Sequence, residues 1–147
     1  MAGGSEWIVE AHGCDPAALA DLGRLRALFD RLVEAFSLHP LEEATWHQWP
    51  NQRMAPAGCG PASTADLAGG PGGITGLWLL SESHLACHTF PEHRTLCLNL
   101  FCCRPRPDWD FEGCLRREFA ATRVRVRRLD RPYREPDQEP DQGKDEP

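Results

Sequence analysis

The sequence lacks a hydrophobic run long enough to cross a membrane. Its longest apolar stretch, Ile74 to Leu80, is far shorter than the roughly 18 residues that a spanning helix needs. The N-terminal residues also lack the positive flank and apolar core of a secretion signal. We therefore expect a soluble, cytoplasmic protein that does not contact a membrane. Its 147 residues suit a single domain.

Most of the chain carries little net charge. The formal net charge is −6, but residues 130–147 hold seven acids and three bases, which leaves only −2 for the rest. This balance gives no reason to expect binding to nucleic acid or to an anionic membrane. The acidic end is rich in proline and nearly repeats Glu-Pro-Asp-Gln. We therefore expect one domain over residues 1–131 and a disordered tail over residues 132–147.

Paired cysteine motifs are also missing. The seven cysteines are an odd number, and no two of them have the C-x-x-C spacing of zinc or redox sites. Without a secretion signal we expect reduced thiols rather than a disulfide framework. A zinc site is conceivable from residue type alone, but the spacing of the candidate ligands matches no common structural zinc motif, so we expect no metal at His84, His88, His93 and Cys97.

Hydrophobic periodicity predicts an α+β fold. Short apolar or alternating runs indicate strands over residues 7–11, 43–49, 76–81, 84–90, 96–101 and 122–129. The helical regions lie between the first two strands and before the last one. This order predicts a two-layer α/β sandwich, with an antiparallel sheet and two helices packed on one face.

Capping residues predict where the two helices begin. Asp15 and Pro16 are expected to start one amphipathic helix that ends before Pro40. Asp108 is expected to cap the second helix, whose buried side holds Trp109, Leu115 and Phe119. Residues 50–73 are rich in Pro, Gly, Ala and Ser and have no period, so this long connection is expected to be mobile or to cover an active site.

Residues 81–92 hold the densest group of reactive side chains and read Ser-Glu-Ser-His-Leu-Ala-Cys-His-Thr-Phe-Pro-Glu. Cys102 and Cys103 follow ten residues later. Taken singly, a Ser or His in a strand is usually a satisfied polar group of the core. A Ser–His–Asp hydrolase site is also conceivable, but the sequence has no G-x-S-x-G elbow.

Taken as a whole, residues 73–92 closely resemble the self-processing site of the small prokaryotic S-adenosylmethionine decarboxylases. The shared pattern is a Gly–Ser/Thr–Gly turn, an apolar strand, Glu-Ser-His, a His four residues later, and Thr-aromatic-Pro-Glu. The Gly-Cys-Asp-Pro turn at residues 13–16 and the Arg-Val-Arg-Val strand at residues 123–126 also resemble the family. The resemblance covers residues 7–131, with a poor match over residues 51–72.

The resemblance implies a self-processed, pyruvoyl-dependent enzyme. Ser83 would attack the carbonyl of Glu82, and elimination would split the chain there and leave a covalent pyruvoyl group at residue 83. Such a ketone forms a Schiff base with a substrate amine and accepts the electron pair left by carbon dioxide, which no ordinary side chain can do. His88 matches the histidine that takes the α-proton during processing. Thr75 matches the hydroxyl residue that supports this step, and Cys103 matches the acid that reprotonates the substrate carbon.

Substrate contacts are also implied by the resemblance. Glu92 matches the carboxylate that binds the ribose hydroxyls. Phe90 stands where the family usually has Trp, and core packing explains it equally well. Trp49 matches an aromatic residue near the adenine site, although some twenty extra residues separate it from the Gly–Thr–Gly pattern. Asn99 stands where the family commonly has Asp.

Three functions are open at this point. The first is an S-adenosylmethionine decarboxylase that supplies decarboxylated S-adenosylmethionine for spermidine synthesis. The resemblance implies a homodimer for it, because the family builds its sites between two copies. The second is a pyruvoyl-dependent decarboxylase of a basic amino acid, ornithine or arginine, which the altered pocket favours. The third is a non-enzymatic paralogue that regulates an active partner, which an intact Ser83, His88 and Cys103 argue against.

Overall fold

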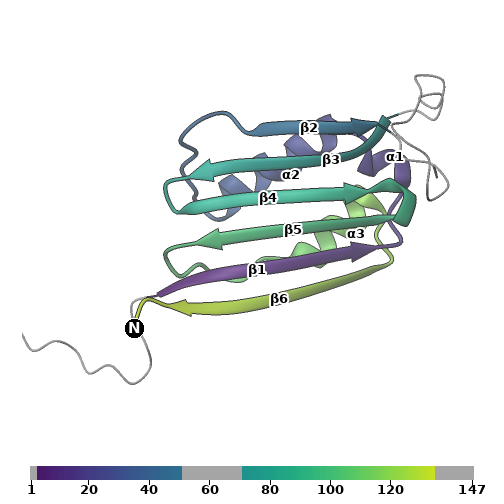
Figure 1. The fold of residues 1–147 in the computed structure, drawn as a ribbon. Coiled ribbons are helices and arrows are strands. Elements are labelled where there is room, and N and C mark those ends of the chain that lie inside the picture. The colour runs from purple at the N-terminus through teal and green to yellow at the C-terminus, as the bar shows by residue number, and fades with distance from the viewer. Residues whose placement is uncertain (1–2, 51–70, 135–147) are drawn as a thin grey trace, which may run out of the picture.

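The structure, a computed structural model, describes residues 3–50 and 71–134. Six antiparallel strands form one layer in the order β2-β3-β4-β5-β1-β6, and the helices cover one face of it (Figure 1). The strands are β1 (Gly3–His12), β2 (Thr45–Pro50), β3 (Pro71–Leu80), β4 (Ser83–Phe90), β5 (Thr95–Cys102) and β6 (Arg123–Pro132). The helices are α1 (Pro16–Leu19), α2 (Leu22–Ala35), the 3-10 helix η2 (Pro91–His93) and α3 (Phe111–Phe119). The predicted α+β sandwich is confirmed.

The core lies between the sheet and the helices. Alternate residues of β5 are buried against the helices, while Cys97, Asn99 and Phe101 lie half-buried on the opposite face, as the alternation predicts. The helices contribute buried apolar side chains to the same layer: Leu25, Leu28, Phe29 and Leu32 from α2, and Phe111, Leu115 and Phe119 from α3. One face of the sheet is therefore packed, and the other, called the open face below, is free of helices (Figure 1).

The N-terminal helical region is two helices, so the prediction of one continuous helix was wrong. Asp15 caps α1 as expected, accepting a hydrogen bond from the amide of Ala17 at 3.1 Å. The helix ends at Leu19, and Asp21 caps α2 by accepting from the amide of Arg24 at 3.1 Å. An aspartate that bonds the amides of the next turn favours a new N-terminus over a continuing helix.

Asp110, and not Asp108, caps α3. The Asp110 carboxylate accepts a hydrogen bond from the amide of Gly113 at 2.8 Å, whereas Asp108 forms an ion pair with Arg128 at 2.7 Å. Aspartate is a preferred N-cap residue, so the sequence allows either position. Asp108 does not cap the helix because its carboxylate pairs with Arg128 of β6. Leu115 and Phe119 are buried, as expected. Trp109, which lies just before the helix, is partly buried and packs against the core.

β3 begins at Pro71, five residues earlier than predicted, so Thr75 and Gly76 lie inside a strand and not in a turn. Gly76 is needed there because the Trp46 ring of β2 crosses it; an added Cβ would come within 2.3 Å of that ring. The last strand, β6, lies at the edge of the sheet. Nearly all of its residues are exposed, whereas the alternating pattern predicts a half-exposed strand.

Parts of two predicted segments lie outside the described residues. These are residues 51–70 of the irregular connection and residues 135–147 of the tail. Within the described ranges, no helix is long and apolar enough to span a membrane.

Candidate active site

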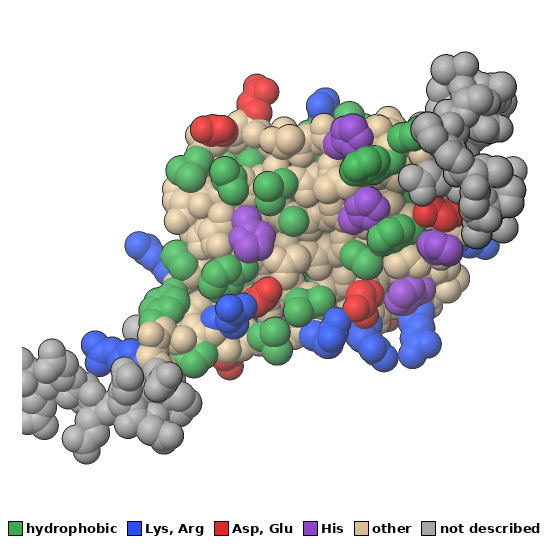
Figure 2. Space-filling view, in the orientation of Figure 1, with side chains coloured by type: hydrophobic (Ala, Val, Ile, Leu, Met, Phe, Trp, Pro, Cys, Tyr) green, Lys and Arg blue, Asp and Glu red, His purple; other side chains and the backbone are tan. Residues whose placement is uncertain are grey.

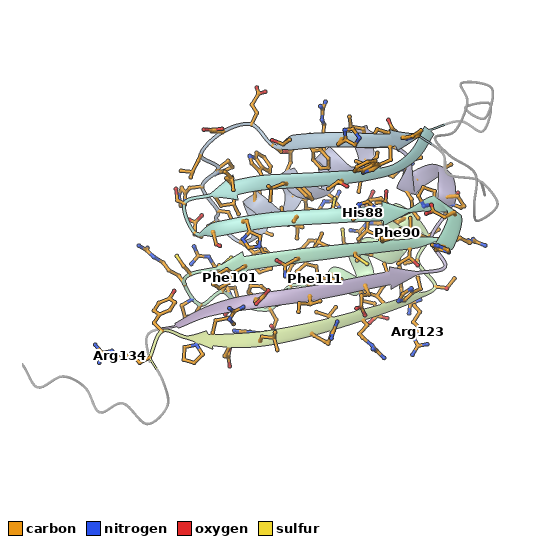
Figure 3. All side chains as sticks on the ribbon, viewed as in Figure 1. His88, Phe90, Phe101, Phe111, Arg123 and Arg134 are labelled. Atoms are coloured by element: carbon orange, nitrogen blue, oxygen red, sulfur yellow. The ribbon has the colours of Figure 1, made fainter. Side chains whose placement is uncertain are left out.

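The residues assigned by resemblance form two groups at opposite ends of β4. The first, called the cleavage group, is Glu82, Ser83 and Cys103. The second, called the histidine group, is Trp49, Thr75, His88, Phe90 and Glu92. Figure 3 shows His88 and Phe90 near one end of the sheet and Phe101, from the strand beside β4, near the other.

The cleavage group holds the bond between Glu82 and Ser83 in an unusual backbone geometry. Ser83 has a φ of 150°, a region that residues other than glycine rarely adopt and that is typical of strained functional sites. The carbonyl oxygen of Glu82 accepts a hydrogen bond from the amide of Cys103 at 2.7 Å. A backbone donor in this position polarises the carbonyl and would stabilise an oxyanion formed on it. Pairing of β4 with β5, which sets Ser83 opposite Cys102, brings these residues together.

The two adjacent cysteines differ sharply in environment. Cys102 points into the core and is fully buried, and this burial raises the pKa of its thiol to about 11. Cys103 is half-buried just beyond the end of β5. Of these two thiols, Cys103 is the one that a ligand can reach. The six cysteines of the described residues are all free thiols.

The Glu82 side chain is anchored away from the open face. Its carboxylate accepts a hydrogen bond from the amide of His39 at 3.0 Å and lies 2.5 Å from His39 Nδ1. The guanidinium of Arg106 is 3.8 Å away. Burial opposes ionisation of Glu82, but the hydrogen bonds from His39 outweigh it and lower the pKa of the carboxyl group. Sequence reasoning missed both partners because they are far from Glu82 in the chain and carry no motif.

Four members of the histidine group, Trp49, Thr75, His88 and Phe90, are joined by direct contacts. Thr75 and His88 pair across β3 and β4, with 2.6 Å between Thr75 Oγ1 and His88 Nδ1. Trp49 donates a hydrogen bond from Nε1 to the same Thr75 oxygen at 2.9 Å. Phe90 lies half-buried on the open face with its ring centroid 4.4 Å from that of His88, so of the two open explanations core packing does not apply. Glu92 follows in η2 and is exposed.

The two groups do not meet within one chain. Ser83 and His88 are five residues apart on one extended strand, which corresponds to about 16 Å at roughly 3.3 Å per residue. His88 lies on the open face, and at the other end of β4 the Ser83 hydroxyl is 3.1 Å from the ring of His84, which is half-buried on the same face. Apolar side chains also lie on the open face (Figure 2). Among these, Leu77 and Leu79 are 42% and 51% exposed. His88 therefore does not reach residue 83 of its own chain.

A further set of polar contacts starts at Ser83 and joins residues of four strands, β4, β5, β1 and β6. Ser83 Oγ lies 3.1 Å from His84 Nδ1, and His84 Nε2 lies 3.0 Å from Asn99 Oδ1. Asn99 Nδ2 donates to Glu6 at 2.9 Å, and Glu6 forms an ion pair with Arg131. One feature of the sequence pointed to this set, namely Asn99 in place of the family's usual Asp. The partners in β1 and β6 belong to no recognisable motif.

A metal site is not formed by the histidines and cysteines of this region. Within residues 3–50 and 71–134, no three His, Cys, Asp or Glu side chains are grouped so that they could hold a metal ion.

Comparison with known proteins gives a consistent result. A family model described as S-adenosylmethionine decarboxylase matches residues 5–132. The chain is 27% identical over 105 residues to the S-adenosylmethionine decarboxylase proenzyme of Pyrococcus furiosus, covering 71% of this chain and 60% of that protein. It is 29% identical over 120 residues to the proenzyme of the same name from Carboxydothermus hydrogenoformans, covering 80% of this chain and 77% of that one. The chain thus spans about 60% of the length of several curated relatives that it matches.

A solved structure agrees in fold. The crystal structure of the adenosylmethionine decarboxylase from Aquifex aeolicus VF5 matches with a TM-score of 0.63 and 17% sequence identity, over 95% of this chain and 98% of that one. At this identity the likeness concerns the fold alone. Because the family model matches most of its length, the chain belongs to the S-adenosylmethionine decarboxylase family.

Proposed function

We propose that this chain cleaves itself between Glu82 and Ser83 and then decarboxylates S-adenosylmethionine. The observation that carries the proposal is the hydrogen bond from the Cys103 amide to the Glu82 carbonyl at 2.7 Å, beside a serine with a φ of 150°. These are the features that an attack of a serine hydroxyl on the preceding carbonyl requires. The word "proenzyme" in the names of the relatives also supports self-processing.

Self-cleavage proceeds in two stages. The Ser83 hydroxyl first attacks the Glu82 carbonyl carbon, and the amide becomes an ester while the Cys103 amide stabilises the oxyanion. A base then removes the α-proton of residue 83. The bond between Cβ and Oγ of this residue breaks, and the main-chain carboxylate of Glu82 leaves. Hydrolysis with loss of ammonia leaves a ketone at residue 83. The strained backbone of Ser83 favours the first stage because the bond rearrangement relieves it.

His88 is the base of the second stage in this proposal. Thr75 Oγ1 has two acceptor positions, so it can accept from Trp49 Nε1–H and from His88 Nδ1–H together. That arrangement leaves His88 Nε2 free to take a proton. An imidazole suits this task because it gains and loses a proton near neutral pH.

The residues fit a pyruvoyl group at position 83. Such a group would supply an electron sink for the carbanion that decarboxylation leaves. Cys103, at the end of the neighbouring strand, would return a proton to the substrate carbon. Glu92 would accept hydrogen bonds from the two ribose hydroxyls, and Phe90 and Trp49 would pack against the nucleoside.

A homodimer is part of the proposal because one chain contains only two half-sites. The cleavage group and the histidine group lie about 16 Å apart along β4. Two copies packed open face to open face would bring the cleavage group of each to the histidine group of the other. The exposed Leu77 and Leu79 on this face fit burial between two such copies, since exposed apolar patches mark interaction surfaces.

The nucleoside substrate is favoured over a basic amino acid. The relatives named above are called S-adenosylmethionine decarboxylases, and the exposed Glu92 beside the histidine group is suited to a diol. None of the contacts described favours ornithine or arginine, or a regulatory paralogue without activity. We also keep as proposals the supply of decarboxylated S-adenosylmethionine for spermidine synthesis, a cytoplasmic location, and a catalytic domain of residues 1–131 followed by an acidic tail.

The test of the proposed function measures carbon dioxide released from carboxyl-labelled S-adenosylmethionine, ornithine and arginine by the purified, processed protein. We expect release from S-adenosylmethionine and little from the two amino acids. Release from ornithine or arginine alone would contradict the proposed substrate. Release from none of them by a correctly cleaved protein would contradict the proposed activity.

A further inference from the structure

Ser83 has an acceptor for its hydroxyl proton within its own chain. The His84 ring is half-buried on the open face, with Nδ1 3.1 Å from Ser83 Oγ. His88 cannot serve the same hydroxyl in the same chain, since it lies about 16 Å away along β4. Self-cleavage has two proton transfers, one from the serine hydroxyl and one from the α-carbon. His84 lies beside the hydroxyl, whereas the proposed function assigns the α-proton to the His88 of a second copy.

Asn99 fixes the proton on His84 to the other ring nitrogen. Glu6 is an acceptor-only carboxylate that receives the Asn99 Nδ2 donor at 2.9 Å. The carbonyl of Trp7 lies 3.5 Å from the same Nδ2, so both neighbours on that side are acceptors. The amide must therefore turn its Oδ1 toward His84, where it lies 3.0 Å from Nε2.

The tautomer follows from this orientation. An amide oxygen can only accept, so the neutral His84 must carry its proton on Nε2. His84 Nδ1 then has a free lone pair, and it faces the Ser83 hydroxyl. The ion pair between Glu6 and Arg131 keeps Glu6 ionised: its hydrogen bond with Asn99 and its contact with Arg131 lower the pKa of the Glu6 carboxyl group despite partial burial.

We propose that His84 is the base that takes the Ser83 hydroxyl proton in the first stage of self-cleavage, and that Asn99 and Glu6 are positioning residues that hold it in the required tautomer. This inference rests on the proposed function. The proton moves from Ser83 Oγ to His84 Nδ1 as the bond from Oγ to the Glu82 carbonyl carbon forms. The carbon–nitrogen bond between Glu82 and Ser83 then breaks, and the proton passes from Nδ1 to the departing nitrogen. Nothing is oxidised or reduced.

The inference assigns the two histidines to separable stages. Loss of His88 blocks elimination, so the ester should accumulate. Loss of His84 blocks ester formation, so the amide should persist. Hydroxylamine distinguishes the two because it cleaves an ester under mild conditions and leaves an amide intact.

The experiment uses full-length chains from cell-free synthesis, followed over time on a denaturing gel with and without hydroxylamine. We compare wild type, His84→Ala, His84→Gln and His88→Ala, with His12→Ala as a control because His12 is exposed at the far end of β1. General base catalysis is typically worth about 10²–10⁴-fold, so cleavage of His84→Ala should slow by about that factor and resist hydroxylamine. Imidazole added to His84→Ala should restore part of the rate, which a merely misfolded variant would not show. His12→Ala should cleave like wild type.

Three results would overturn the assignment of His84: wild-type cleavage rates in both His84 variants, an ester in His84→Ala that hydroxylamine cuts between residues 82 and 83, or no response of slowed His84→Ala to imidazole. A wild-type chain that never cleaves would instead contradict the proposed function itself, so the two failures are distinguishable.

The positioning residues have their own test. Asn99→Leu removes the acceptor that faces His84 Nε2 and should slow cleavage at least 10-fold. The double variant Glu6→Gln with Asn99→Asp keeps an acceptor facing His84 and supplies a donor to hold it, so it should cleave near the wild-type rate. Equal rates for Asn99→Leu and wild type, or failure of the double variant to exceed Asn99→Leu, would contradict the positioning role.

Discussion

The amide nitrogen of Cys103 lies 2.7 Å from the carbonyl oxygen of Glu82. The backbone of Cys103 thus contacts the bond proposed to be cut, while its side chain is the proposed proton donor for the later reaction. Since a substitution of the side chain leaves the backbone donor in place, the two steps that involve this residue can be separated experimentally.

Cys103→Ala should therefore still cleave itself but lose decarboxylase activity. General acid catalysis is typically worth about 10²–10⁴-fold, and turnover of the processed variant should fall within that range. Cys102→Ala is the matched control: its buried thiol should cost about 1 kcal/mol in unfolding free energy and little turnover. Cleavage on a gel, turnover and denaturant unfolding measure the three quantities. A larger loss of turnover in Cys102→Ala would show that the roles of the two cysteines are reversed.

Two defective chains should repair each other if the site forms between copies. Neither Ser83→Ala nor His88→Ala should complete cleavage alone. In a mixed dimer, the Ser83 of the His88→Ala chain meets the His88 of the Ser83→Ala chain, which makes one complete site. Co-expression with different affinity tags, followed by mass spectrometry, should show cleavage of the His88→Ala chain only. An uncut His88→Ala chain in purified mixed dimers would contradict a site shared between two copies.

Glu92→Gln should weaken binding of S-adenosylmethionine more than it slows turnover. A hydrogen bond to a charged group contributes about 1.5–3 kcal/mol, so KM should rise about 10- to 150-fold while kcat changes less. Glu112→Gln, an exposed carboxylate in α3 on the helical layer, is the control and should behave like wild type. Unchanged KM in Glu92→Gln would rule out a contact with the ribose.

Acid should remove the stabilising contribution of Glu82. Its folded pKa is lowered, so its stabilising effect is fully present above the unfolded value near 4.3 and is lost as the pH falls through the folded value. In the uncut Ser83→Ala background, adding Glu82→Gln should lower the unfolding free energy by about 1 kcal/mol at pH 7. The difference between the two proteins should shrink below about pH 4. A difference that grows toward acid pH would contradict the assigned direction.

Periodicity was enough to predict the layers of the fold, because alternating burial in β5 and the apolar stripe of α2 leave few other arrangements. Periodicity was insufficient to predict which aspartate caps a helix. Asp21 begins a second helix that the continuous apolar pattern conceals, and Asp110 takes the cap that Asp108 could have supplied. Such choices depend on tertiary partners, here Arg128 for Asp108.

The site was partly predictable for a similar reason. Resemblance gave each functional residue a role, but not the distance between Ser83 and His88, which follows from their shared extended strand. The contacts of His84 with Asn99 and Glu6 join strands from distant parts of the chain, so only the sheet order reveals them.

Intact mass spectrometry of the freshly purified wild-type protein, beside Ser83→Ala, tests the central claim most directly. Self-cleavage predicts two wild-type fragments, residues 1–82 ending in Glu82 and residues 83–147 beginning with a pyruvoyl group in place of serine. Ser83→Ala, which has no hydroxyl to attack the carbonyl, should remain a single uncut chain. A wild-type protein that decarboxylates S-adenosylmethionine while still in one piece, or a Ser83→Ala chain cut at the same bond, would contradict the account.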